Sequence, residues 1–286
     1  MGKLTDLFEI IRGGGEVTSD SASHIIPSDP NRDIFIADLV DCALKNDWHS
    51  MEHPMFTLSK MPDLKERHYE HNGNSITITP SVKGLATIWD KDILIYAVSQ
   101  LIEALNQNRQ PSRTIQTVPR VLLVGINRHV GGGDYRQLEA ALDRLAGTRI
   151  RTNIVTDSQR IRHAFGLIDE WKTVEKTSTG RMAKIEITLS QWLYNAVLAR
   201  EVLTLDRAYF TLSSALERRL YELARKHCGR QHKWRVSLEL LHKKAGTTGT
   251  LKELRRKVRK IAEANPLPGY QLGYEPEADM LIFCSR

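Results

Sequence analysis

The chain has 286 residues, of which 41% are hydrophobic and 26% are charged, so it can build two or three folded units. Its formal net charge of +7 is compatible with binding a polyanion. The charge is uneven, because residues 200–286 contain 18 Lys and Arg against 10 Asp and Glu, whereas residues 1–50 contain 4 against 9. The three cysteines are too far apart for a disulfide framework or a zinc site, and no segment is apolar enough for export or for a membrane span. These features predict a soluble cytoplasmic protein.

Residues 1–50 are predicted to be an acidic, mobile and partly disordered N-terminal extension. The stretch from 18 to 30 is rich in Ser, Asp and Pro and cannot supply a core. Residues 31–46 carry Ile34, Phe35, Leu39 and Ala43, which predicts one amphipathic helix at the end of the extension.

Two short segments of this extension share an aspartate followed by an aliphatic residue and a phenylalanine. The pattern resembles degenerate forms of the peptide that bacterial proteins insert into the replication sliding clamp, where two adjacent apolar side chains fill a pocket. Both segments lack the leading glutamine of such peptides, so the alternative is a helix end that packs on its own domain. The sliding clamp is therefore a candidate partner through Leu7, Phe8, Ile34 and Phe35.

Residues 51–199 are predicted to form a first globular domain. Its helix from Asp90 to Asn106 is apolar over more than one face, which suits its own core or, alternatively, a dimer interface. A second long helix, from Asp134 to Ala146, is ended by Gly147. The other predicted elements are strands at 55–60, 75–79, 113–118, 148–155, 166–174 and 182–188, and helices at 119–127 and 190–198.

Residues 200–286 are predicted to form a second domain around a cationic helix at 250–263. Leu251, Leu254, Val258 and Ile261 make one apolar stripe, and lysines and arginines project from the opposite face. A long helix, a short strand, a short helix capped by Ser237 and a tight turn precede it, at 213–228, 234–236, 237–245 and 246–249; a β-hairpin at 270–274 and 280–283 follows. This order is typical of a winged helix-turn-helix domain, whose second helix enters the DNA major groove. The alternative is the charged, solvated face of an ordinary surface helix.

Both domains show the same order of elements: long helix, short strand, short helix, Gly-containing turn, second helix and β-hairpin. Residue identity between them is poor, so the repeat is one of architecture. The predicted fold class is α+β, with two tandem winged helix-turn-helix domains behind the extension. Two such domains are expected to read major grooves about one helical turn apart.

The candidate DNA contacts are polar and cationic side chains on the two recognition helices, the turn and the first wing. Arg256 or Arg259 is expected to reach guanine O6 and N7 in bidentate fashion, while other cations neutralise phosphates. The face of the first domain is nearly balanced in charge, so it is expected to read bases lightly or to contact a protein. The full set is Arg136, Gln137, Arg144, Arg149, Arg151, Lys243, Lys244, Thr247, Thr248, Thr250, Lys252, Arg255, Arg256, Arg259 and Lys260.

Other chemistries have weaker support in the sequence. A nicking enzyme needs a metal-holding His-x-His pair and a nucleophilic tyrosine; the nearest candidates are His68 and His71, at a different spacing, with Tyr221 or Tyr194. The scattered histidines do not match a metal site, and no Gly-Lys-Ser/Thr follows the glycines at 131–133. We therefore expect no enzyme activity, metal or cofactor. A stand-alone winged-helix repressor shares every DNA-binding feature and stays an alternative.

Several longer runs resemble the RepA-type replication initiator proteins of bacterial plasmids (replication initiator protein A). The likeness extends from about residue 51 to the C-terminus, and in chain order it is carried by Ser50–Lys60, Thr79–Tyr96, Leu142–Asn153, Phe165–Asp169 and Leu216–Gly229. The resemblance implies tandem winged-helix domains that bind repeated origin sequences (iterons) in double-stranded DNA. It also implies recruitment of the host initiator and the replicative helicase in the bacterial cytoplasm, a monomer–dimer equilibrium, and repression of the protein's own promoter by the dimer.

Overall fold

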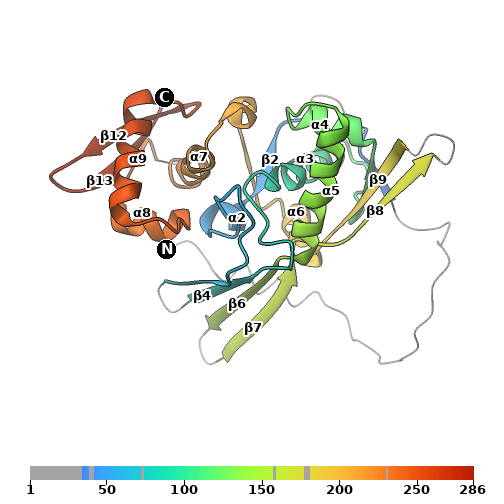
Figure 1. Cartoon of the computed structure of the whole chain (residues 1–286), viewed down its shortest axis with the longest axis horizontal. Helices are drawn as coiled ribbons and strands as arrows, with labels where there is room; N and C mark the ends of the chain where they lie inside the picture. Colours follow the sequence, from blue (N-terminus) through green and yellow to red (C-terminus); the bar gives the residue numbers. More distant parts are fainter. Residues whose placement is uncertain (1–33, 39–41, 72–73, 157–158, 177–180, 230) are drawn as a thin grey trace.

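The computed structural model describes residues 34–38, 42–71, 74–156, 159–176, 181–229 and 231–286. Figure 1 shows residues 215–286 at one end of the molecule, most of residues 91–198 at the other, and a β-sheet below their junction. The buried apolar side chains of both ends belong to one contiguous cluster. No helix in this described part of the chain is both long and apolar enough to cross a membrane.

The first sheet has the strand order β1-β5-β9-β8, and only β1 and β5 pair in parallel. Its strands are Ile34–Ile36 (β1), Thr114–Thr117 (β5), Ile168–Lys176 (β8) and Arg181–Leu189 (β9). The predicted helix over 31–46 is wrong for the described residues, because β1 is an edge strand. Phe35 is buried and Ile36 is exposed, as alternate residues of a half-covered strand must be.

Four helices pack around this sheet: α3 (Lys91–Asn106), α4 (Pro119–Gly125), α5 (Gly132–Gly147) and α6 (Gln191–Leu198). All four were predicted, with Pro119 in the first turn of α4. The Ser190 hydroxyl, which accepts from the Leu193 amide, caps α6. Helix α3 is buried along nearly its whole length. The apolar faces of α3 therefore pack in the protein's own core, which was the first of the two alternatives that the sequence left open. They are not available as a dimer interface with a second copy.

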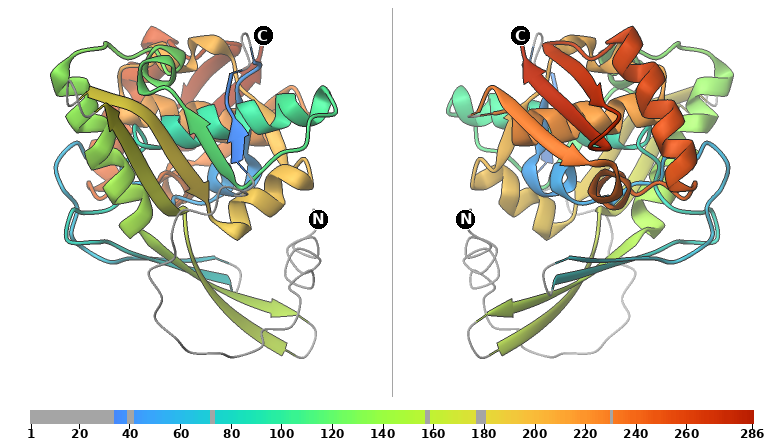
Figure 2. Two further views of the ribbon diagram at one scale, coloured as in Figure 1. Left: turned by 90° about the vertical axis from the view of Figure 1, so that its right-hand side faces the viewer. Right: turned by 90° about the vertical axis from the view of Figure 1, so that its left-hand side faces the viewer.

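The second sheet is antiparallel, with the order β3-β4-β6-β7. Its strands are Arg67–His71 (β3), Asn74–Thr79 (β4), Arg149–Thr156 (β6) and Gln159–Gly166 (β7). Figure 2 shows β6 and β7 extending away from the helical body. Strands β3 and β7 were not predicted. The strands predicted at 148–155, 166–174 and 182–188, expected to form one wing together, are divided between the two sheets. The strand predicted at 55–60 is reduced to a single bridge between Thr57 and Thr87.

The C-terminal elements agree with prediction. After a 3-10 turn η1 (Arg207–Thr211) come α7 (Ala215–His227), β11 (Lys233–Ser237), α8 (Leu238–Ala245), α9 (Leu251–Ala264), β12 (Tyr270–Glu275) and β13 (Met280–Ser285). The three strands form an antiparallel sheet in the order β11-β13-β12. The Ser237 hydroxyl accepts a hydrogen bond from the Leu240 amide at 3.3 Å and so caps α8.

A buried polar network joins the two ends of the molecule between α3 and α7. The Lys91 ammonium lies 2.7 Å from a Glu222 carboxylate oxygen, and the Arg218 guanidinium lies 2.6 Å from Asp92. None of these four side chains is more than 4% exposed. Buried charges occur in proteins only when they are paired, so α3 and α7 are held in one relative position.

Residues assigned to the N-terminal extension also belong to this junction. Strand β2 (Lys45–Asp47) pairs antiparallel with β10 (Val202–Thr204), and α2 (Trp48–Glu52) follows directly. The Arg219 guanidinium donates to the α2 carbonyls of Ser50 and Met51 at 3.2 and 3.0 Å. The segment before residue 51 thus contributes backbone to both ends of the fold.

Candidate nucleic-acid interface

Helix α9 is amphipathic, and a local cap sets its beginning. The Thr250 hydroxyl accepts from the Glu253 amide at 3.2 Å, and the Glu253 carboxylate accepts from the Thr250 amide at 2.8 Å. Leu254, Val258 and Ile261 are buried, as predicted. The apolar stripe therefore fixes which side of α9 faces solvent, and the Thr250 hydroxyl oxygen serves the cap.

The outward side of α9 is cationic. The guanidinium of Arg259 on this side lies 4.9 Å from the centre of the Tyr274 ring in β12. None of its other cations forms an ion pair with a described residue. This cationic face consists of Lys252, Arg256, Lys257, Arg259 and Lys260. Lys257 was not among the predicted contacts. It lies at the edge of the cationic face, and the sequence alone does not show which neighbouring elements that edge adjoins.

Two predicted cations of this region are paired instead. Arg255 makes a two-pronged bond to Asp279, at 2.8 and 2.7 Å, in the turn between β12 and β13. Lys244 is paired with Glu52 of α2. Contrary to the prediction, these two side chains are not free to neutralise phosphates, and they hold the cationic helix and its partner helix in place. Lys243 is exposed.

The electrostatics of Glu52 show how closely α2 is bound to the C-terminal part. Burial acts to raise its pKa, but Lys244, His227 and Lys226 surround the carboxylate and together hold the pKa down at about 2. The same burial lowers the pKa of Lys226 to about 7. The cluster is therefore a structural junction and not part of the exposed cationic face.

The turn between α8 and α9 is tight and internally bonded. Gly246 ends α8 in the left-handed conformation, with φ 67°. His242 Nε2 lies 2.6 Å from the Gly249 carbonyl oxygen, and the Thr247 hydroxyl accepts from the Gly249 amide at 3.3 Å. Thr248 is exposed. The turn thus presents a hydroxyl to solvent beside the start of α9.

Helix α5 offers a smaller polar surface. Arg136 and Gln137 are exposed near its N-terminus. Arg144 at the other end is not free, because its guanidinium donates to both carboxylate oxygens of the buried Asp90 at 2.7 and 2.8 Å. Arg144 therefore fixes α5 to the start of α3, and its predicted contact with DNA is not supported by this geometry.

The remaining predicted cations lie on β6. Arg149 and Arg151 are exposed, while Ile150 between them is buried, so the two arginines share the outward face of the second sheet. The register places Arg151 opposite Thr77 of β4 and Ala164 of β7. The sheet thus carries cations on the face that is turned away from the core.

The residues that nicking chemistry would need are engaged elsewhere. Tyr221 is buried and its hydroxyl accepts from the Asp206 amide at 2.7 Å; burial raises the pKa of Tyr221 to about 12. Tyr194 donates to the Pro111 carbonyl at 2.9 Å, and His68 Nδ1 lies 3.1 Å from the Thr77 hydroxyl. Among the described residues, no three His, Cys, Asp or Glu side chains gather as a metal site would require.

The predicted contact with the sliding clamp involves two pairs of residues. Phe35 is buried in the first sheet, so Ile34 and Phe35 are not available as a protruding peptide in this fold. Leu7 and Phe8 lie outside the described residues.

Comparisons with known proteins agree with the sequence resemblance. The family model for replication initiator protein A matches residues 45–272. A protein of Wigglesworthia glossinidia brevipalpis that carries the provisional description of replication protein is 38% identical over 259 residues, which cover 89% of this chain and 94% of that one. Two crystal structures of domains 2 and 3 of RctB share the fold. They have TM-scores of 0.60 and 0.52, are 12% and 15% identical, and cover 83% and 81% of this chain and 98% and 95% of theirs.

Proposed function

Since the chain belongs to the replication initiator protein A family, we propose that it starts plasmid replication by binding repeated sequences (iterons) at the origin. The bound protein would then recruit the host initiator and the replicative helicase. The cationic face of α9 is the observation that carries this proposal, because an exposed, largely unpaired row of cations on a rigid helix is what a phosphate backbone attracts.

The order of the elements supports an interpretation of both ends of the molecule as winged helices. In the C-terminal part, α8 and α9 form the helix-turn-helix and β12 and β13 the wing; in the first part, α4 and α5 are followed by β8 and β9. We assign α9 and α5 as the recognition helices of two tandem modules. The hairpin of β6 and β7 is inserted between α5 and its wing, which distinguishes the first module from the second.

The roles within the cationic face follow from side-chain chemistry. Arg256 is exposed at the middle of α9 and unpaired, so its planar guanidinium suits a bidentate contact with guanine O6 and N7. Lys260 is one helical turn further on and suits a phosphate. Arg259 is steadied by Tyr274 and is the second candidate for a base contact.

The test compares alanine variants on duplexes with and without the repeats. We expect Arg256→Ala to weaken repeat binding by about 1–3 kcal/mol and to relax the preference at one base pair, whereas Lys260→Ala should weaken every duplex alike and reduce the salt dependence. Lys233→Ala, which removes an exposed cation on β11, outside the assigned recognition helices and wings, is the matched control and should change neither affinity. Equal, sequence-blind losses for Arg256→Ala and Lys260→Ala would contradict the assignment of Arg256.

Two other functions make different predictions in simple assays. A nicking initiator would relax supercoiled origin plasmid in the presence of Mg²⁺ or Mn²⁺, whereas we propose binding without a covalent step. A stand-alone repressor would protect only its own promoter. A footprint over the origin separates these functions, because an initiator should protect repeated blocks at helical-turn spacing.

A further inference from the structure

Two neighbouring loops expose apolar side chains that nothing in the described chain covers. The paired loops, as we name them, are residues 59–65 and 80–84. Met61 is 74% exposed, Leu64 61% and Val82 92%. Three exposed lysines stand among them: Lys60, Lys65 and Lys83. Single exposed apolar residues are common on protein surfaces, but a group of them in adjoining loops marks a contact surface.

The paired loops are held in one conformation by a buried carboxylate. Asp63 accepts hydrogen bonds from the Thr57 hydroxyl at 3.1 Å, from Arg67 Nε at 3.1 Å and from the Lys65 amide at 3.2 Å. Its own carbonyl accepts from the Leu85 amide at 2.9 Å, which ties the first loop to the second. The apolar side chains are therefore presented by a preorganised scaffold.

Gly84 makes this close approach of the two loops possible. It adopts φ +92°, and a Cβ added there would lie 3.0 Å from the Asp63 amide nitrogen. No other residue type fits both the conformation and the space.

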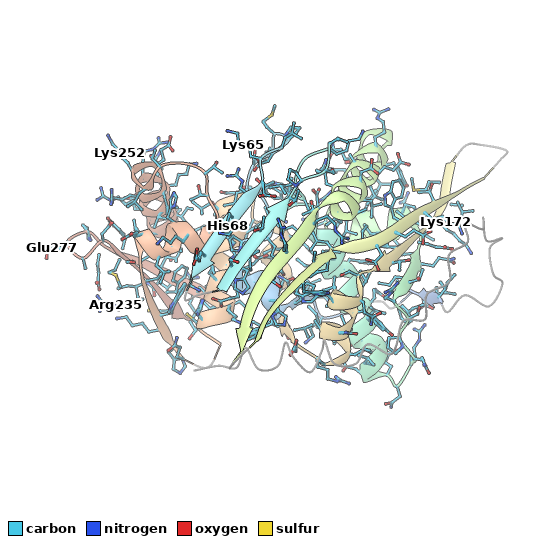
Figure 3. All side chains as sticks on the ribbon, turned by 90° about the horizontal axis from the view of Figure 1, so that it is seen from below. Lys65, His68, Lys172, Arg235, Lys252 and Glu277 are labelled. Carbon is cyan, nitrogen blue, oxygen red and sulfur yellow. The ribbon has the colours of Figure 1, made fainter. Side chains whose placement is uncertain are left out.

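The paired loops lie between the two proposed recognition helices. Ser81 touches the end of α5 so closely that a Cβ added at Gly147 would lie 2.4 Å from the Ser81 Cβ. On the other side, the segment from 57 to 60 lines a depression together with Thr247 and Thr248 of the turn before α9 and Lys257 of α9 itself. Figure 3 shows Lys65 and Lys252, the first cation of α9, along the same edge of the molecule.

The charged side chains around the exposed apolar residues indicate which kind of partner the paired loops bind. The first loop and the residues just beyond it contain two acidic side chains. Asp63 is neutralised by Arg67, whereas Glu66 accepts from the Thr79 hydroxyl at 2.9 Å and keeps its charge, so the three lysines outnumber the one uncompensated carboxylate. None of the three lysines forms an ion pair with a described residue, and the Lys60 ammonium lies 5.5 Å from the centre of the Trp89 ring. Apolar side chains surrounded by cations without carboxylate partners fit DNA better than they fit an apolar protein surface.

We propose that the paired loops enter the DNA minor groove between the two major grooves read by α5 and α9. There Met61, Leu64 and Val82 act as an apolar wedge that opens a base step and bends the duplex, while the lysines hold the flanking phosphates. The inference rests on the proposed function, because two major grooves about one turn apart on one face of the duplex have the minor groove facing the protein midway between them. Apolar wedges at such positions unstack base pairs and kink DNA.

The test uses the full chain and a duplex of about 30 bp, three helical turns, that carries one block protected in the origin footprint. One duplex series carries 2-aminopurine at successive central steps, and another carries fluorophores at both ends. The wild-type protein should raise the 2-aminopurine emission at one central step and shorten the end-to-end distance. The triple variant Met61→Ala, Leu64→Ala, Val82→Ala should lose both signals and bind the repeat about tenfold more weakly.

The controls separate this proposal from the one on which it rests. Arg256→Ala should weaken binding but leave the bend and the 2-aminopurine signal intact once the duplex is saturated. Ile36→Ala with Leu198→Ala removes two exposed apolar side chains from β1 and α6, outside the proposed DNA-reading elements, and should change nothing. Circular dichroism melting of the triple variant should match the wild type, because only exposed side chains are shortened.

The other outcomes each overturn one idea. If the triple variant bends and unstacks the duplex like the wild type, the wedge is refuted. If alanine in place of Lys60, Lys65 and Lys83 weakens binding and the triple apolar variant does not, the loops contact phosphates alone and the wedge is again refuted. Unchanged DNA signals together with lost binding to a host replication protein would mark the loops as a protein contact. Failure of the wild type to prefer the repeats would instead refute the proposed function.

Discussion

Replacing Glu222 by glutamine should loosen the junction between the two ends of the molecule. Its carboxylate accepts from Lys91 at 2.7 Å, from Tyr209 at 3.1 Å and from Arg219 at 3.0 Å, and the side chain is 1% exposed. Glutamine keeps the volume and one acceptor oxygen but removes the negative charge and turns an amide toward one of the donors. Breaking a buried pair from one side costs about 3–5 kcal/mol, and we expect the lower end of that range. Because whole domains are stable by only about 5–15 kcal/mol, the loss should be large.

Urea unfolding followed by tryptophan fluorescence measures this loss. The matched control is Glu275→Gln, which removes the partner of Arg235 from an exposed pair and should cost about 0–1 kcal/mol. Replacing both members of the buried pair, Lys91→Met with Glu222→Leu, should recover only part of the stability. It removes the Lys91 charge, but it leaves the buried Arg219 guanidinium with carbonyl acceptors in place of the Glu222 carboxylate. A Glu222→Gln protein within about 0.5 kcal/mol of wild type would show that the pair does not hold the junction, and the reasoning would fail.

Two further predictions concern the same region. Burial lowers the pKa values of His53 and His227 to about 4, so the unfolded chain takes up these two protons at a higher pH than the folded protein does. The unfolding free energy should therefore fall by about 2 kcal/mol per histidine between pH 8 and pH 5. His227→Gln should remove the contribution of one histidine to this pH dependence. Gly246→Ala should destabilise the protein by more than about 1 kcal/mol, because the residue has φ +67° and its new Cβ would lie 2.5 Å from the Pro54 Cβ. Gly269→Ala, with φ +71° and open space around it, isolates the conformational part, and equal thermal shifts for the two variants would contradict the role of the Pro54 contact.

The C-terminal elements could be predicted from the sequence because local residues determine them. Ser237 and Thr250 cap the helices that follow them, and Leu254, Val258 and Ile261 repeat at helical spacing. Each of these signals needs only the few residues around it. The cationic face of α9 follows from the same periodicity, so its exposed members were identified correctly, apart from the omission of Lys257.

The N-terminal part could not be predicted in the same way, because its structure depends on distant partners. Ile34–Ile36 forms a strand only because Thr114–Thr117 offers a parallel edge far along the chain. In isolation the segment has the apolar spacing of a helix, and tertiary pairing overrides that preference. The division of β6, β8 and β9 between two sheets likewise depends on register with strands that sequence spacing does not reveal.

The same argument explains which predicted site residues turned out to be paired. Arg144, Lys244 and Arg255 look like free cations in the sequence because each is on a helix that carries other lysines and arginines. Their carboxylate partners lie 54, 192 and 24 residues away. A charged residue on a helix is therefore a candidate for DNA contact only after its distant neighbours are known.

The buried network between α3 and α7 has a consequence for reading DNA. Apolar side chains of similar volume would stabilise such a junction at least as well, so stability alone does not account for four charged groups there. Paired charges, however, are satisfied in one relative position only, since a shift of either helix would leave an unpaired charge in the core. Helices α5 and α9 are fixed to opposite sides of this junction, α5 through Arg144 and Asp90 at the start of α3, and α9 through the C-terminal core that includes α7. Under the proposed function, the distance between the two grooves that one chain can read is set by this network and not by a flexible linker.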